Sequence, residues 1–145
     1  RLVERFGERH DVAWSFPARE RIAAASVAEL AAVGLSSRKA EHLLGLARSD
    51  LDLAALADAP DAEVVRAVTA IRGLGRWSAD WFLARALARP DAWPAGDLGL
   101  RKAVARFYRG GDMPSEDEMR ALGERFGRRR NLAAHMLLAA ARIGA

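Results

Sequence analysis

Two glycines flank one apolar residue in Gly73-Leu74-Gly75, at the point where one predicted helix ends and another begins. Glycine permits positive φ, which we expect at Gly75, and lets the backbone approach another surface closely while Leu74 tucks between the helices. Together with Arg76 just before it and Ser78 in its first turn, the second helix would present unpaired amides and a positive dipole end, and these favour a phosphate. Such a turn binds a DNA backbone without reading bases. An ordinary helical hairpin is the alternative, and the three residues alone favour it.

Trp77 and Trp81 lie four residues apart on the second predicted helix, so both indoles share one face. Two aromatic rings in that arrangement can stack against an electron-poor planar ring through π and cation–π contact. A pair of core tryptophans has the same spacing. The spacing therefore leaves a binding pocket for such a ring and a hydrophobic core as open alternatives.

Asp97 follows a loop that contains proline and glycine, and it precedes the helical run Leu98–Tyr108. The commoner role of an aspartate in this position is to cap the helix. Capping would also fix the carboxylate and favour its ionised form, so a structural and a chemical role are compatible. Since asparagine caps a helix about as well as aspartate, we expect Asp97→Asn to fold normally.

Helical signals dominate the rest of the sequence, and no segment of five or more residues alternates apolar and polar side chains as a strand should. We therefore predict an all-α fold. Capping boxes begin at Ser26 and at Ser115. The predicted helices run from Ser26 to Gly34, from Ser36 or Ser37 to about Arg48, from Pro60 to Gly73, from Trp77 to about Ala88, from Asp97 to about Tyr108, from Ser115 onward, and from about Arg130 to Ile143.

The 145 residues, 51% of them hydrophobic, fit one domain over positions 1–145. The chain begins with Arg1 and with a helical run already under way, so we expect a fragment, the C-terminal part of a longer chain. The formal charge is +4, and the basic residues are almost all arginines. Arginine suits phosphate, but many arginine-rich proteins bind nothing anionic, so charge alone favours a solvated basic surface.

The absence of cysteine excludes disulfides, thiolate metal sites and cysteine-ligated iron–sulfur clusters. The three histidines have no ligand spacing, so we expect no metal held by side chains. The apolar stretches, such as 136–141, are too short to span a membrane, and we expect no signal peptide. We expect a soluble intracellular protein.

The run from Ile71 to Ala79 closely resembles the helix-hairpin-helix of the DNA base-excision glycosylase superfamily. About twenty residues later, the loop Pro94-Ala95-Gly96-Asp97 carries the aspartate that this family requires. Within the superfamily the sequence is most similar to the bacterial alkylation-repair branch, DNA-3-methyladenine glycosylase II. The similarity extends from about Phe16 to Gly144, and Gly34–Ala40 also resembles the family's helix junction before the hairpin.

This resemblance implies a DNA glycosylase that removes alkylated purines from double-stranded DNA. Asp97 would stabilise the oxocarbenium-like transition state and could orient or deprotonate the attacking water. The damaged nucleotide would be flipped into a pocket that contains Trp77, with Trp81 and Leu98 as further pocket residues. Bifunctional members use a lysine where this chain has Trp77, so the resemblance implies a monofunctional enzyme that leaves an abasic site.

The resemblance also implies a cytoplasmic, nucleoid-associated bacterial monomer without a cofactor, except for a possible monovalent cation at the backbone carbonyls around Ile71 and Gly73. The segment Gly127–Asn131 lacks a tryptophan that related enzymes place near the pocket, so the lesion is left open. Uracil or a deaminated purine is the alternative substrate. A non-catalytic DNA-binding domain that keeps the hairpin is the alternative outside enzymes, and Asp97 argues against it.

Overall fold

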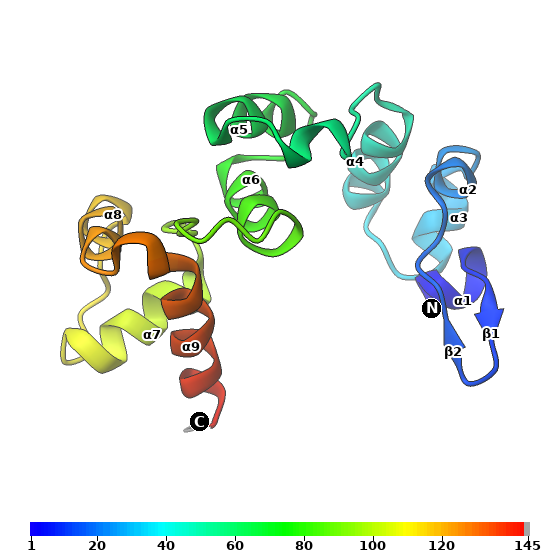
Figure 1. Cartoon of the computed structure of the whole chain (residues 1–145). Coiled ribbons are helices and arrows are strands. Elements are labelled where there is room, and N and C mark those ends of the chain that lie inside the picture. Colours follow the sequence, from blue (N-terminus) through cyan, green and yellow to red (C-terminus); the bar gives the residue numbers. More distant parts are fainter. Residues whose placement is uncertain (144–145) are drawn as a thin grey trace. The chain divides into compact units, whose positions relative to one another are not determined.

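The computed structural model describes residues 1–143 and is mostly helical, as the sequence predicts (Figure 1). Short 3-10 turns (η1, η3) and one π-helical turn (η2) join the α-helices. Within the described residues, no helix is both long and apolar enough to cross a bilayer. The elements in chain order are α1 (Leu2–Phe6), β1 (Arg9–His10), β2 (Ala13–Trp14), α2 (Arg19–Ala23), α3 (Val27–Ala32), α4 (Ser37–Arg48), η1 (Ala55–Ala57), α5 (Asp61–Thr69), α6 (Arg76–Trp81), η2 (Phe82–Ala86), α7 (Leu98–Tyr108), α8 (Glu116–Glu124), η3 (Gly127–Arg129) and α9 (Arg130–Ile143).

Contacts divide the chain into two units. Unit 1 comprises residues 1–52 and 70–73, and unit 2 comprises residues 53–69 and those from 74 onward. The expectation of one domain over positions 1–145 stays a prediction, because contact clusters can divide a domain more finely than its boundaries do.

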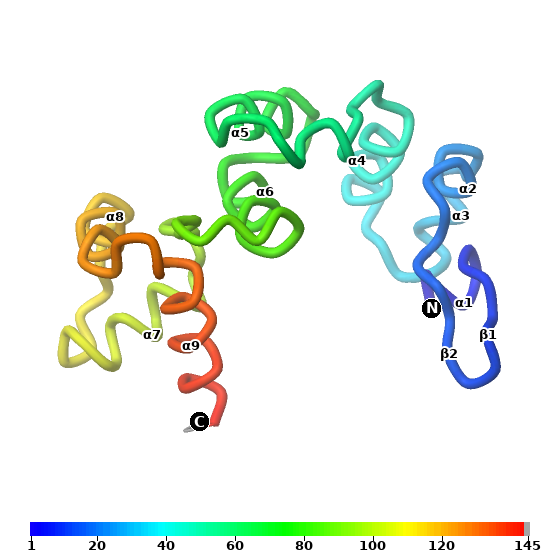
Figure 2. Tube along the Cα trace, viewed as in Figure 1, coloured from blue at the N-terminus to red at the C-terminus, as the bar shows by residue number. Residues whose placement is uncertain are grey.

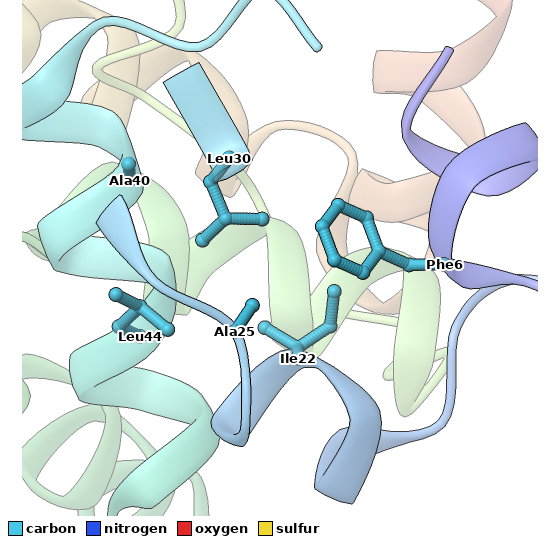
Figure 3. Close-up of a cluster of buried hydrophobic side chains, with 6 residues drawn as sticks. All are labelled: Phe6, Ile22, Ala25, Leu30, Ala40 and Leu44. Atoms are coloured by element: carbon cyan, nitrogen blue, oxygen red, sulfur yellow. The ribbon is translucent and has the colours of Figure 1, made fainter. Parts of the chain in front are cut away.

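Unit 1 has a hydrophobic cluster in which side chains from α1 to α4 point toward one another (Figure 3). The capping box predicted at Ser26 begins α3, with the Ser26 hydroxyl accepting from the Glu29 amide. Gly34 ends this segment with a φ of +103°. The buried members of the cluster are Phe6, Ile22, Ala25, Leu30, Ala40 and Leu44.

An antiparallel β-hairpin precedes α2, and the sequence analysis did not predict it (Figure 2). Arg9 pairs with Trp14 and His10 with Ala13, so each strand has only two residues. Strands of this length are too short for the alternation of apolar and polar side chains to form a readable pattern.

Unit 2 is built around a second hydrophobic cluster, in which α7, α8 and α9 meet the loop that precedes α7. Leu100 and Val104 lie on the buried face of α7, and Met119 of α8 and Ala134 of α9 are fully buried against them. Trp93 anchors the preceding loop in the same cluster. Both the capping box at Ser115 and the predicted last helix are confirmed.

The connection between α5 and α6 differs from the prediction at both ends. The first helix ends at Thr69, before the predicted end at Gly73. Gly73 has a φ of +91°, whereas Gly75 has a φ of −111° and precedes α6 as its N-cap. The expectation of positive φ at Gly75 is therefore wrong, and the left-handed residue of this turn is Gly73.

The second helix of the connection is also not continuous. After Trp81 it widens into the π turn η2, where the amide of Leu87 donates to the carbonyl of Phe82 at 3.0 Å. The sequence pattern predicted one helix from Trp77 to about Ala88. A π turn inserts an extra residue into a helix, and such turns are frequent at functional sites.

The two glycines of the turn should respond differently to alanine. A Cβ at Gly73 would lie 2.2 Å from the ring of His42 and would have an unfavourable φ, whereas a Cβ at Gly75 meets no atom within 4 Å. We expect Gly73→Ala to lower the free energy of unfolding by about 1–3 kcal/mol, because strain and a steric clash add. Gly75→Ala is the matched control and should cost less, because it meets no clash and loses only the small preference of an N-cap for glycine over alanine. Urea titrations of both variants test this, and equal stabilities would contradict it.

Candidate active site

The loop that leads to Asp97 is fixed by hydrogen bonds and burial. Trp93 donates from its indole nitrogen to the carbonyl of Met119 at 2.7 Å, and a Cβ at Gly123 would meet the Trp93 ring. The Asp97 amide donates to the carbonyl of Pro94 at 2.9 Å, and Pro94 is fully buried. The backbone of Asp97 therefore has little freedom.

The start of α9 holds the other end of the same loop. Asn131 donates from its side-chain amide to the carbonyls of Ala84 and Arg89, at 2.8 and 2.9 Å, and its backbone amide donates to the carbonyl of Pro90. The sequence analysis assigned no such role to Asn131. Asparagine is common at the start of helices for local reasons. Its position in the sequence therefore does not indicate hydrogen bonds to residues that are distant along the chain.

Asp97 accepts hydrogen bonds from three donors on two helices. Its Oδ1 accepts from the Leu100 amide at 2.8 Å, which confirms the predicted cap of α7. Its Oδ2 accepts from the indole nitrogens of Trp77 and Trp81, at 2.9 and 3.0 Å. The two indoles do lie on one side of α6, but their N–H edges meet the carboxylate.

These contacts keep the carboxylate ionised. Burial by itself would raise the pKa of Asp97, but the hydrogen bonds from Trp77, from the Leu100 amide and from Trp81, with a smaller effect of the nearby Gly99 amide, outweigh it. The pKa of Asp97 therefore lies below its ordinary value. A partly buried, ionised and oriented carboxylate can stabilise positive charge that develops next to it.

The two tryptophans have different surroundings. Trp77 is 55% exposed, whereas Trp81 is partly buried. The guanidinium carbon of Arg85 lies 4.4 Å from the Trp81 ring centre, and the ring of His135 contacts Trp81 edge-on at 5.8 Å. One face of the Trp81 ring is therefore already covered by a cation.

A pocket of about 660 Å³ opens beside Asp97 and is lined by residues of unit 2. Its side chains come from α6, η2, α7 and α9, and four of them carry a positive charge. The pocket therefore combines one carboxylate with a basic rim. The lining residues are Trp77, Trp81, Arg85, Asp97, Gly99, Lys102, Ala103, Arg106, Leu138, Ala141 and Arg142.

Leu98 does not have the position that the sequence analysis gave it. It is 55% exposed and is absent from the residues that line this pocket. Gly99 lies in the pocket wall instead. A Cβ there would be only 3.1 Å from Oδ1 of Asp97 and 3.3 Å from Leu138.

The residues assigned to DNA binding lie around the connection before α6. Leu74 is partly buried, as expected. The amide of Ser78 donates to the carbonyl of Gly75 at 3.0 Å, so unpaired amides are expected only before Ser78. Arg76 forms a salt bridge from Nε to the buried Asp80 at 2.7 Å, and this pairing reduces the positive charge that Arg76 offers to a phosphate.

Asp80 is the buried charged group of this helix. Burial raises the pKa of Asp80, and the hydrogen bond and charge of Arg76 only partly oppose that effect.

Within residues 1–143, no three histidine, aspartate or glutamate side chains are close enough together to hold a metal ion.

Comparisons with known proteins give one consistent family. Residues 1–129 match the family described as HhH-GPD superfamily base excision DNA repair protein. The DNA-3-methyladenine glycosylase of Bacillus subtilis (strain 168) is 30% identical over 126 residues, which cover 81% of this chain and 42% of that protein.

Solved structures agree with this result. A 3-methyladenine DNA glycosylase from Archaeoglobus fulgidus matches with a TM-score of 0.87 and 35% identity, over 99% of this chain and 51% of that one. A Schizosaccharomyces pombe 3-methyladenine DNA glycosylase in complex with abasic DNA matches with a TM-score of 0.81 and 26% identity, over 88% of this chain and 65% of that one. The chain spans less than two thirds of the length of each of these relatives.

The contacts of Asp97 revise the expectation for Asp97→Asn. An asparagine has one acceptor oxygen, so its NH₂ group must face either the Leu100 amide or the two indole N–H groups. We expect the variant to fold but to lose about 1–3 kcal/mol of unfolding free energy at neutral pH, because hydrogen bonds to a charged acceptor are lost and partly buried donors can be left without a partner. Asp91→Asn, an exposed change in the same loop, is the control.

The stability difference should depend on pH with a definite sign. Because the pKa of Asp97 is lower in the folded than in the unfolded protein, its stabilisation is complete above the unfolded-state value and is lost as pH falls through the folded-state value. The difference between parent and Asp97→Asn should therefore shrink in acid. Urea unfolding at several pH values measures it, and equal stability at neutral pH would overturn this account of the carboxylate.

Proposed function

The chain belongs to the HhH-GPD superfamily of base excision DNA repair proteins, and on that premise we propose that it is a monofunctional DNA glycosylase. Its substrate is an alkylated purine of the 3-methyladenine type in double-stranded DNA. The observation that carries this proposal is the ionised carboxylate of Asp97, fixed by three donors at the wall of an open pocket. The names of its relatives favour the same lesion class.

The reaction breaks the bond between C1′ of the deoxyribose and the ring nitrogen of the base. The bonding electrons leave with the base, and the sugar acquires positive charge at C1′ and its ring oxygen. Asp97 stabilises that charge at short range, where a preorganised carboxylate is most effective. Water then adds to C1′ and releases a proton, which leaves an abasic site in an intact strand.

The side chain at position 77 supports hydrolysis without strand cleavage. An indole has no nucleophilic amine, so Trp77 cannot form the Schiff base that leads to strand cleavage. Lys102 brings an amine to the pocket, but it is exposed and lacks the desolvation that activates a nucleophilic lysine. The absence of lyase activity is therefore part of the proposal.

The turn before α6 is the proposed contact with the DNA backbone. The space around the Gly75 α-carbon is open, so a phosphate can approach the amides that begin α6. Such contact carries no base preference, and affinity for duplex DNA should depend strongly on salt. A monovalent cation at the carbonyls of Ile71 and Gly73, a monomeric state and a cytoplasmic location stay predictions.

Single-turnover excision from a duplex with one 7-methylguanine tests the function. We expect the parent to release the base, and we expect Asp97→Asn to be on the order of a hundredfold slower, because a preorganised transition-state charge is lost. Asp91→Asn should keep the parental rate. The strand should be cut only after hot alkali, and borohydride should trap no covalent adduct.

Two results would contradict the proposal in different ways. Near-parental excision by Asp97→Asn would make Asp97 a helix cap only. A borohydride-trapped adduct would show a bifunctional enzyme. Loss of that adduct in Lys102→Met would identify the Lys102 amine as the group that forms it.

A further inference from the structure

We propose that Trp77 and Trp81 are positioning residues that hold the Asp97 carboxylate through their indole N–H groups, and that they are not the platform on which the damaged base stacks. This inference rests on the proposed function, because Asp97 is the charge that the reaction needs. It differs from the base-pocket role that the family resemblance implied for the two tryptophans.

The two indole donors converge on a single atom. Trp77 and Trp81 are one helical turn apart on α6, and both donate to Oδ2 of Asp97, at 2.9 and 3.0 Å. A carboxylate oxygen accepts about two hydrogen bonds, so Oδ2 has its full set of partners. Because Oδ1 is bound by the Leu100 amide, the plane of the carboxylate is fixed in one orientation.

The surroundings of the rings argue against base stacking on Trp81. Arg85 lies over one face of the Trp81 ring, and the ring of His135 contacts it edge-on. A cationic alkylated base would therefore meet a face already covered by a guanidinium. Trp77 is more exposed, but its position is also set by the bond from its N–H edge to Asp97.

The same geometry limits what Asp97 can do. With two donors on Oδ2 and one on Oδ1, the carboxylate is a weak base and a well-oriented charge. Loss of one indole donor frees a lone pair and makes Asp97 more basic. If Asp97 acted by taking a proton from water, that change would raise the rate; if it acts as a positioned charge, the rate falls.

The experiment separates the N–H group from the aromatic ring. Trp77 and Trp81 are each replaced by β-(3-benzothienyl)alanine, which keeps the bicyclic ring but has sulfur in place of N–H, and in parallel by Phe and by Ala. Trp14→Phe is the control, because Trp14 lies in unit 1 and donates to no carboxylate in the described hydrogen bonds. Single-turnover excision of 7-methylguanine is measured against pH for every variant.

We expect the benzothienyl and Phe variants to excise on the order of tenfold more slowly, because a hydrogen bond to a charged group is lost while the ring is kept. Their acidic limb of activity should move to higher pH, since the donors that lower the pKa of Asp97 are missing. Trp14→Phe should match the parent in excision rate and in the pH at which its activity falls in acid. A lost packing contact alone would lower the rate without moving the limb.

Two outcomes overturn the inference. If the benzothienyl variants keep the parental rate and limb while the Ala variants lose excision, the rings act by stacking. If removal of the N–H group raises the rate, Asp97 acts as a base.

A second readout is independent of catalysis. The parent should lose stability as pH falls from about 5 through the folded-state pKa of Asp97, and the benzothienyl variants should lose less, since their Asp97 pKa lies nearer the unfolded-state value. If the parent releases no base at all, the proposed function fails, and this pH dependence alone decides the inference. An identical pH dependence in parent and variants contradicts it.

Discussion

The arrangement of unit 2 depends on one constraint, which is that a partly buried carboxylate must find hydrogen-bond donors. Asp97 obtains one donor from the first turn of α7 and two from α6. Desolvation opposes the ionised form, and the three donors outweigh it. This balance requires α6 and α7 to begin at fixed positions. The buried anchor at Trp93 and the bonds from Asn131 provide that fixed geometry.

The charges around the pocket divide into two groups with different tasks. The basic side chains Arg85, Lys102, Arg106 and Arg142 line the same pocket as Asp97. Positive charge along a cleft attracts a polyanion from a distance and raises its local concentration. In the proposed reaction, the single carboxylate acts only at contact distance, on the carbon where positive charge develops. An enzyme that works on DNA therefore needs both, and it needs the carboxylate to stay ionised among cations.

Local signals predicted most of the fold. Ser26, Ser115 and Asp97 are all observed caps, because a cap depends on residues only three positions apart. The two-residue strands at 9–10 and 13–14 were missed, since no period can be read from so few residues. Gly73 and Gly75 look alike in sequence, and only the folded backbone shows that Gly73 has positive φ and that a Cβ there would meet His42.

The sequence analysis identified the main residues around the pocket but not the hydrogen bonds between them. Asp97, Trp77 and Trp81 were singled out by type, spacing and family resemblance, and all three line the pocket. The direction of the indole N–H groups depends on side-chain torsions and on where α7 begins, and helical spacing contains neither. Leu98 was placed in the pocket as the neighbour of Asp97, yet Gly99 is the residue in the wall. A helix turns by about 100° per residue, so a neighbour in sequence need not share a face.

The account rests on Asp97 as an ionised carboxylate held by two indoles, and nuclear magnetic resonance can test that directly. The measurement follows the carboxyl carbon of Asp97 and the indole protons of Trp77 and Trp81 through an acid titration of the whole chain. The account predicts a pKa for Asp97 below the ordinary aspartate value, with both indole protons shifting at the same midpoint. A pKa at or above the ordinary value, with indole protons that do not respond, would contradict it.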